Sequence, residues 1–132
     1  MNQCYNTGEV KAVSRNLTAD VVDPYVGGLC GWAQNNSFSD CYNVGGLKTT
    51  SYNSNTSYRH NMVYIGGLVG YGGKLSFTRC FNKGYANKGS TYYYWIGGIV
   101  GADSGRASTY TNTYWPYYGY MEGVENVFKS SI

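Results

Sequence analysis

Charged residues and histidine are scarce in this 132-residue chain. Only 13% of its residues are Asp, Glu, Lys or Arg, the formal net charge is +3, and there is a single histidine. So weak and scattered a charge argues against nucleic acid or a membrane surface as partner. No apolar run approaches the roughly 20 residues that a transmembrane helix needs. The composition therefore points away from proteins that work through strong charge or a membrane span.

Groups that could catalyse a reaction are also few. A zinc peptidase needs a pattern such as His-Glu-x-x-His, but the lone His60 has no acidic neighbour, and the same shortage argues against a serine or cysteine hydrolase. Parallel β-helix enzymes that cut polysaccharides use clustered carboxylates. Here the acidic residues are dispersed, and Asp20 and Asp23, three residues apart, precede a proline that favours a turn. We predict no catalytic residue, no metal site and no cofactor.

Glycine and tyrosine are the residues that the chain has in excess. There are 19 glycines and 16 tyrosines, well above ordinary usage. Tyr, Thr, Val and Phe favour strands, Gly and Asn favour turns, and helix formers are sparse, so the composition is that of an all-β protein. The N-terminus lacks the basic and apolar regions of a signal peptide. Because the chain begins inside a repeat, we expect a piece of a larger protein, with Met1 added for expression.

Two short blocks recur along the chain. The copies of the first are 26–31 (VGGLCG), 65–70 (IGGLVG) and 96–101 (IGGIVG). The second, Ser-Phe-Ser/Thr-x-Cys-Tyr/Phe-Asn, occurs at 37–43 and 76–82, with a degenerate copy at 109–115 and a half copy at 4–6. Equivalent positions recur every 31 to 39 residues, and such periods are typical of solenoids and propellers.

The spacing of the blocks divides each unit into a fixed part and a segment of variable length, which is how insertions collect on one side of a solenoid. We therefore predict an all-β fold, a short right-handed parallel β-solenoid of about three turns with side hairpins. A propeller-like array of blades is the alternative. The chain is expected to be one domain, 1–132, with repeat units near 1–31, 32–70 and 71–101 and a partial C-terminal unit at 102–132.

Stacked units would align equivalent residues in rows. The expected rows are Tyr25/Tyr64/Trp95, Val26/Ile65/Ile96, Leu29/Leu68/Ile99 and Tyr5/Tyr42/Phe81/Tyr114. A ladder of side-chain amides is expected from Asn6, Asn43 and Asn82, since buried amides must be hydrogen-bonded. In the second block we place Thr78 and Cys80 inward, which turns Phe77 outward and leaves it in need of cover. The glycine pair marks a sharp bend or a close approach of two backbones.

The cysteines follow the repeat. Cys4, Cys41 and Cys80 are equivalent positions, Thr113 takes the next, and Cys30 aligns with a valine in the other copies. Exchange with small residues predicts buried free thiols that act as small hydrophobic groups. A disulfide between neighbouring turns is the alternative, and no Cys-x-x-Cys metal spacing is present.

Together, the two blocks resemble the GLUG repeat. Its Gly-Leu-x-Gly core is present at 28–31 and 67–70 and, with Ile for Leu, at 98–101. Residues 112–115 (NTYW) resemble the Asn-Cys-Tyr-Trp at which such arrays often end, with Thr113 in place of Cys. GLUG arrays occur in secreted or wall-anchored bacterial proteins, including adhesin-like proteins and immunoglobulin-A-cleaving metallopeptidases, where they lie outside the catalytic domain. The resemblance implies a non-enzymatic structural and adhesive module at a bacterial cell surface or cell wall, and supplies no site residues.

Two alternative functions stay open. Tyrosine gives binding surfaces contact area and a hydroxyl at low entropic cost. Five tyrosines in the variable segments could bind a host glycan or an extracellular-matrix or surface protein, or could simply cover the outer face of the sheet. They are Tyr52, Tyr58, Tyr92, Tyr93 and Tyr94. The other alternative is a non-catalytic accessory region of a secreted peptidase.

Open solenoid ends expose strand edges, so head-to-tail self-association is also expected. Nucleic acid and membrane are not expected partners.

Overall fold

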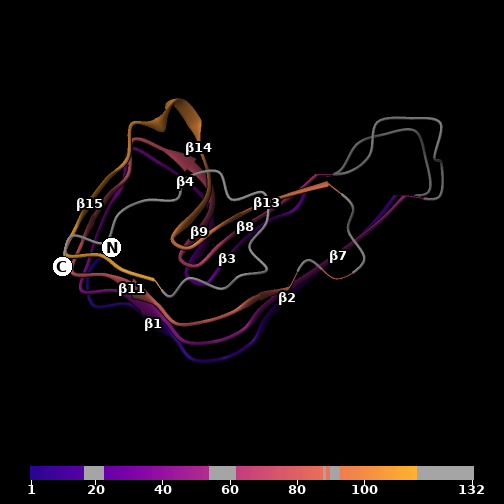
Figure 1. Ribbon diagram of the computed structural model, residues 1–132, viewed down its shortest axis with the longest axis horizontal. Coiled ribbons are helices and arrows are strands. Elements are labelled where there is room, and N and C mark those ends of the chain that lie inside the picture. Colours follow the sequence, from indigo (N-terminus) through magenta and orange to yellow (C-terminus); the bar gives the residue numbers. More distant parts are fainter. Residues whose placement is uncertain (17–22, 54–61, 88, 90–92, 116–132) are drawn as a thin grey trace.

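The fold is all-β in the part of the chain that the structure, a computed structural model, describes (Figure 1). That part comprises residues 1–16, 23–53, 62–87, 89 and 93–115, with the side chains of 14–16, 50–53, 93 and 106 left out. It contains strands β1 to β15 and one 3₁₀ helix, η1 (Ser104–Arg106). No helix among these residues has the length and apolar character needed to cross a membrane.

The strands form five sheets, and each sheet takes one strand from each of three successive coils. The body of the solenoid is enclosed by β1 (Tyr5–Asn6), β6 (Tyr42–Asn43) and β11 (Phe81–Asn82); β5 (Ser37–Ser39), β10 (Ser76–Thr78) and β15 (Thr109–Thr111); and β4 (Cys30–Gln34), β9 (Val69–Gly73) and β14 (Val100–Asp103). A side arm is built from β2 (Val10–Asn16), β7 (Leu47–Asn53) and β12 (Ala86–Asn87), and from β3 (Tyr25–Gly27), β8 (Met62–Gly66) and β13 (Tyr93–Gly97).

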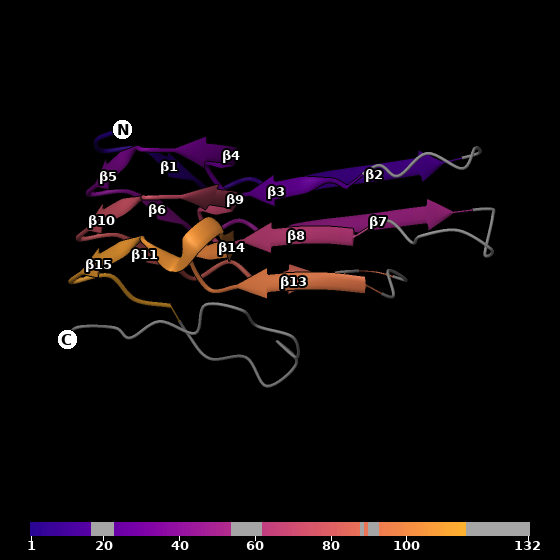
Figure 2. The same ribbon diagram turned by 90° about the horizontal axis from the view of Figure 1, so that it is seen from above.

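Every strand pairing in these five sheets is parallel. Figure 1 looks down the stack, where the coils trace one another closely, and Figure 2 shows them as layers seen from the side. This is the predicted parallel β-solenoid of about three turns. The propeller alternative is excluded, because propeller blades are antiparallel sheets.

The side extensions are present as an arm rather than as hydrogen-bonded hairpins. In the second coil, β7 runs outward and β8 returns, so the outline resembles a hairpin (Figure 1). The two strands nevertheless belong to different sheets, and each pairs with the equivalent strands of neighbouring coils. A cluster of buried apolar residues fills the space between the two arm sheets: Val26, Leu47, Val63, Ile65, Ala86 and Ile96.

The predicted rows are confirmed. Strand register and backbone hydrogen bonds align Tyr25/Tyr64/Trp95, Val26/Ile65/Ile96, Leu29/Leu68/Ile99 and Tyr5/Tyr42/Phe81/Tyr114. In the last row, successive ring centroids lie 5.1, 4.9 and 5.5 Å apart. The repeat therefore sets the register, because each coil presents the same residue to the coil above it.

The asparagine ladder is also confirmed. Nδ2 of Asn6 donates to Oδ1 of Asn43, and Nδ2 of Asn43 donates to Oδ1 of Asn82, both at 2.9 Å. Each amide also bonds the backbone N–H and C=O of the glycine two residues later. Tyr114 pairs with Phe81, so Trp115 occupies the position in the last coil that is equivalent to Asn82. Its ring lies against Gly98, just as the amide of Asn82 lies against Gly67. An indole thus ends the ladder.

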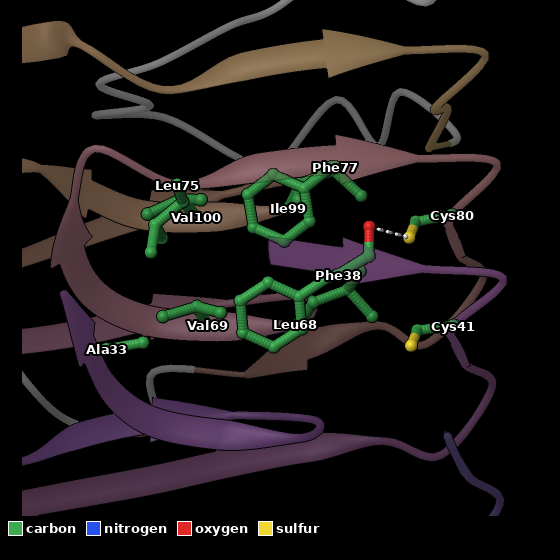
Figure 3. Close-up of a cluster of buried hydrophobic side chains, with 10 residues drawn as sticks. All are labelled: Ala33, Phe38, Cys41, Leu68, Val69, Leu75, Phe77, Cys80, Ile99 and Val100. Carbon is green, nitrogen blue, oxygen red and sulfur yellow. Dashed lines mark hydrogen bonds between the residues drawn. The ribbon is translucent and has the colours of Figure 1, made fainter. Parts of the chain in front are cut away.

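The outward orientation predicted for Phe77 is wrong. Phe38 and Phe77 are 2% and 0% exposed, and their rings stack with centroids 5.0 Å apart in the core of the body. Figure 3 shows them among aliphatic side chains from the facing strands, with the sulfur atoms of Cys41 and Cys80 beside them. These two cysteines are buried as predicted, so Phe77 and Cys80 both face the core.

A turn between Phe77 and Cys80 explains the error. Arg79 adopts a left-handed backbone conformation, with φ of 52°, and the equivalent Asp40 has φ of 54°. A residue in that region bends the chain and interrupts the two-residue alternation of a strand. Thr78, predicted to point inward, is consequently only half-buried.

The two turn residues pair with one another across neighbouring coils. Nε and Nη2 of Arg79 donate to the two carboxylate oxygens of Asp40 at 2.6 and 2.7 Å. These bonds lower the pKa of Asp40, so the pair persists at neutral pH and is lost as the pH falls through that lowered pKa. Because the pair lies at the surface, we expect it to contribute little to stability.

All four cysteines are free thiols, as predicted. Cys41 and Cys80 are 0% exposed, and their thiols donate to the carbonyl oxygens of Ser39 and Thr78. Burial raises the pKa of Cys80. The predicted burial is wrong for Cys4 and Cys30, which are only half-buried, because they lie in the first coil of the stack, which has no coil before it among the described residues.

These differences predict selective thiol reactivity. In the native protein we expect dithiobis(nitrobenzoate) to modify Cys4 and Cys30 and to leave Cys41 and Cys80 intact, because a buried thiol is inaccessible and the thiolate is the reactive form. In denaturant all four should react. Peptide mapping of the labelled protein checks the assignment, and rapid native labelling of Cys80 would contradict it.

Candidate functional site

Of the five tyrosines predicted to bind a ligand, only Tyr94 has a described side chain. It is half-buried and packs against the apolar cluster inside the arm. The backbones of Tyr52 and Tyr93 lie in β7 and β13, but their side chains are outside the described part of the chain. Tyr58 and Tyr92 lie wholly outside it.

A different set of aromatic side chains gathers where each coil turns from the arm into the body. There β3, β8 and β13 end at the glycine pair, and β4, β9 and β14 begin just after it (Figure 1). The set, here named the aromatic corner, comprises Tyr25, Trp32, Tyr64, Tyr71 and Trp95. Tyr25, Tyr64 and Trp95 form one row, and Trp32 and Tyr71 pair in register on the adjoining sheet.

The glycines of the first block allow the two sheets to meet at this corner. A methyl group on Gly66 would overlap the carbonyl oxygen of Val69. One on Gly70 would lie 2.6 Å from the backbone nitrogen of Val26 and 2.7 Å from the carbonyl oxygen of Gly31. Neither Gly66 nor Gly70 has a positive φ, so these positions need the small size of glycine rather than its conformational freedom.

The three tyrosine rings of the aromatic corner are tilted against one another. Tyr25 and Tyr64 have centroids 5.2 Å apart at 50°, Tyr25 and Tyr71 lie 5.2 Å apart at 35°, and Tyr64 meets Tyr71 at 5.3 Å and 83°. Tilted rings leave part of each face open, and Tyr25 and Trp32 are 43% and 54% exposed.

The long ring row on the body differs in this respect. Its successive rings are within 8° of parallel, so neighbouring rings cover one another's faces. That row is a stabilising ladder, whereas the tilted tyrosine rings of the aromatic corner do not stack face to face.

The chemistry of the corner suits a neutral ligand with both C–H and hydroxyl groups. Its five side chains carry no formal charge at neutral pH, and the negative ring faces attract C–H groups, while the tyrosine hydroxyls can donate and accept hydrogen bonds. Nε1 of Trp95 donates to the sulfur of Met62 at 2.6 Å, which fixes this indole on the sheet. A pyranose ring has the matching combination of C–H faces and hydroxyl edges.

No group of three or more His, Cys, Asp or Glu side chains that could hold a metal ion occurs among the described residues, and His60 lies outside them. The chain matches no known family model, no curated protein and no solved structure. The resemblance to the GLUG repeat therefore rests on the sequence motif alone, and the function has to be argued from the residues.

Part of the aromatic corner was visible in the sequence. The row of Tyr25, Tyr64 and Trp95 was predicted, but its contact with Tyr71, the register partner of Trp32, was not. The sequence did show that Trp32 and Tyr71 occupy equivalent positions, since each directly follows the last glycine of the first block. Recognising it would have required knowing that this glycine folds one sheet against the other.

Proposed function

We propose that the chain is a non-enzymatic structural and adhesive module of an extracellular bacterial surface protein. In this proposal the stacked coils are the scaffold and the aromatic corner is the adhesive surface. The observation that carries it is the set of tilted rings of Tyr25, Tyr64 and Tyr71, together with Trp32, the register partner of Tyr71, which is 54% exposed. Tryptophan and tyrosine on a rigid support give large contact area at low entropic cost, and they dominate binding hot spots. The bacterial surface location rests on the GLUG resemblance.

A host glycan is the ligand class that the corner fits best. The match is between the ring faces and hydroxyls of Tyr25, Tyr64 and Tyr71 and the alternating C–H and hydroxyl groups of a sugar. A matrix or surface protein with exposed apolar and hydroxyl side chains is the second candidate, because aromatic surfaces are also common in protein recognition.

The test is a screen of wild-type chain against a glycan array and a panel of matrix proteins. We expect specific binding that weakens at least tenfold in Trp32→Ala, since loss of a hot-spot side chain costs about 1.4 kcal/mol or more. Tyr5→Ala is the matched control: Tyr5 is 64% exposed but belongs to the ring row on the body, so binding should be unchanged. A folded monomer that binds nothing, or equal losses in both variants, would contradict the proposal.

Self-association must be controlled in this screen. The first-coil strands β1 to β5 are edge strands of their sheets in the described part of the chain, and exposed edges pair readily with other chains. Head-to-tail stacking of copies would present many corners at once and raise the apparent affinity. Light scattering at the screening concentration therefore has to show a monomer.

A further inference from the structure

The first coil of the solenoid leaves part of its core open. It forms the outermost layer at the N-terminal end, and its strands are β1 to β5 (Figure 2). Asn6 and Leu29 are only half-buried there, whereas their equivalents in the second coil, Asn43 and Leu68, are 0% exposed. The surface that each later coil buries against the coil before it is therefore open on the first coil. We call this surface the first-coil face.

The last coil does not show the same opening in the described part of the chain. Ile99, which continues the row of Leu29 and Leu68, is 2% exposed, and Val100 is 1% exposed. Trp115 packs against this part of the core, and its ring lies over Gly98. Both ends of the stack carry strand edges, but only the N-terminal end leaves core positions open.

Exposed apolar side chains also gather on the first coil. Eight large hydrophobic side chains are exposed among the described residues, and five of them belong to this coil. The five are Met1, Tyr5, Val13, Tyr25 and Trp32. A concentration of exposed apolar side chains on a folded domain commonly marks a site of interaction with another protein.

The edges of the first-coil face have little protection against pairing. Charged side chains and prolines are the usual means by which an edge strand is kept from binding another chain. In the first coil, β1, β3, β4 and β5 contain no charged residue and no proline, and only β2 carries charge, at Lys11 and Arg15. The face therefore combines open backbone groups, open core positions and a low density of charge.

We propose that the first-coil face binds the same face of a second copy of the chain, which gives a two-fold symmetric dimer. Head-to-tail stacking, the arrangement expected from the sequence, would place this face against a last coil whose core is already covered. Contact between two first-coil faces covers the open core of both copies at once. A two-fold axis across the stack reverses the direction of one coil, so facing edge strands run antiparallel and can form hydrogen bonds. Because each copy has one such face, association ends at two copies.

The dimer goes beyond the adhesive function and sets a condition on it. Tyr25 and Trp32 belong both to the aromatic corner and to the first coil. They are 43% and 54% exposed in the single chain, and contact between two first-coil faces reduces that exposure. A glycan and a second copy of the chain therefore compete for these two side chains, and adhesion belongs to the monomer.

The test is sedimentation equilibrium of the wild-type chain over a wide range of concentration, where we expect monomer and dimer and no larger species. In Tyr5→Lys the dimer should dissociate about tenfold or more readily, because each copy brings a positive charge to the contact. Tyr114→Lys is the matched control and should leave the dimer unchanged. Tyr5 and Tyr114 are the first and last rings of one row and are 64% and 38% exposed, so each variant loses stacking on one neighbour. Circular dichroism verifies that both variants are folded.

Three outcomes would overturn the proposal. A mass that grows beyond the dimer, with equal losses in the two variants, would show head-to-tail stacking. A monomer at every concentration would show that the face binds no second copy, and a dimer unaffected by Tyr5→Lys would place the contact elsewhere. The experiment contains no glycan and Tyr5 lies outside the aromatic corner, so its failure is distinct from failure of the adhesive proposal.

Discussion

Gly67→Ala is expected to lower the free energy of unfolding by about 4 kcal/mol or more, enough to unfold a chain of ordinary stability. A methyl group at Gly67 would overlap the carbonyl oxygen of Gly98 in the next coil and the amide of Asn82. Neither can retreat cheaply, because one is backbone and the other is a buried member of the ladder. Urea unfolding followed by circular dichroism gives the change.

Gly8→Ala is the control for this substitution. The nearest atom to a methyl group there is Oδ1 of Asn6 at 3.7 Å, an ordinary contact, and Gly8 is exposed. We expect a change within about 0.5 kcal/mol, as for most surface substitutions. If Gly67→Ala were as stable as Gly8→Ala, the close stacking of glycine blocks in neighbouring coils would be wrong.

Asn43→Ala is expected to cost about 3–5 kcal/mol. Four hydrogen bonds are lost, and their partners are Nδ2 of Asn6, Oδ1 of Asn82, and the N–H and C=O of Gly45. Asn43 is 0% exposed, so water does not replace these bonds, and each group left unsatisfied in the core carries its own penalty of about 1 kcal/mol or more. Thermal and urea unfolding both measure the loss.

Asn36→Ala provides the comparison, since its Nδ2 makes one bond, to the carbonyl oxygen of Gln34, at the surface. A loss below about 1 kcal/mol is expected for that variant. Similar stability of the Asn43 and Asn36 variants would mean that the amides do not form a continuous buried ladder.

The repeat made the register predictable but not the direction of every side chain. The amides of Asn6, Asn43 and Asn82 could be aligned from the sequence because stacking is in register once the period is known. The burial of Phe77 could not, because it depends on the left-handed turn at Arg79. Arginine rarely adopts that conformation, and the available signal was that Asp40 and Asn112, residue types that adopt it more readily, occupy the equivalent positions in the neighbouring coils.

One contact at the candidate surface is not encoded in a single-sequence period. The aromatic corner needs Tyr64 and Tyr71 to meet across a bend between two sheets, which depends on the close approach at Gly70.

The most direct test of the aromatic corner as the binding surface is an NMR titration with the best-binding glycan of the array. It follows the side-chain N–H signal of each tryptophan. Trp32 and Trp95 belong to the corner, whereas Trp115 lies at the end of the asparagine ladder. We predict that the indole signals of Trp32 and Trp95 shift with saturation and that the signal of Trp115 stays in place. Binding that moves only Trp115, or none of the three, would contradict recognition at the corner.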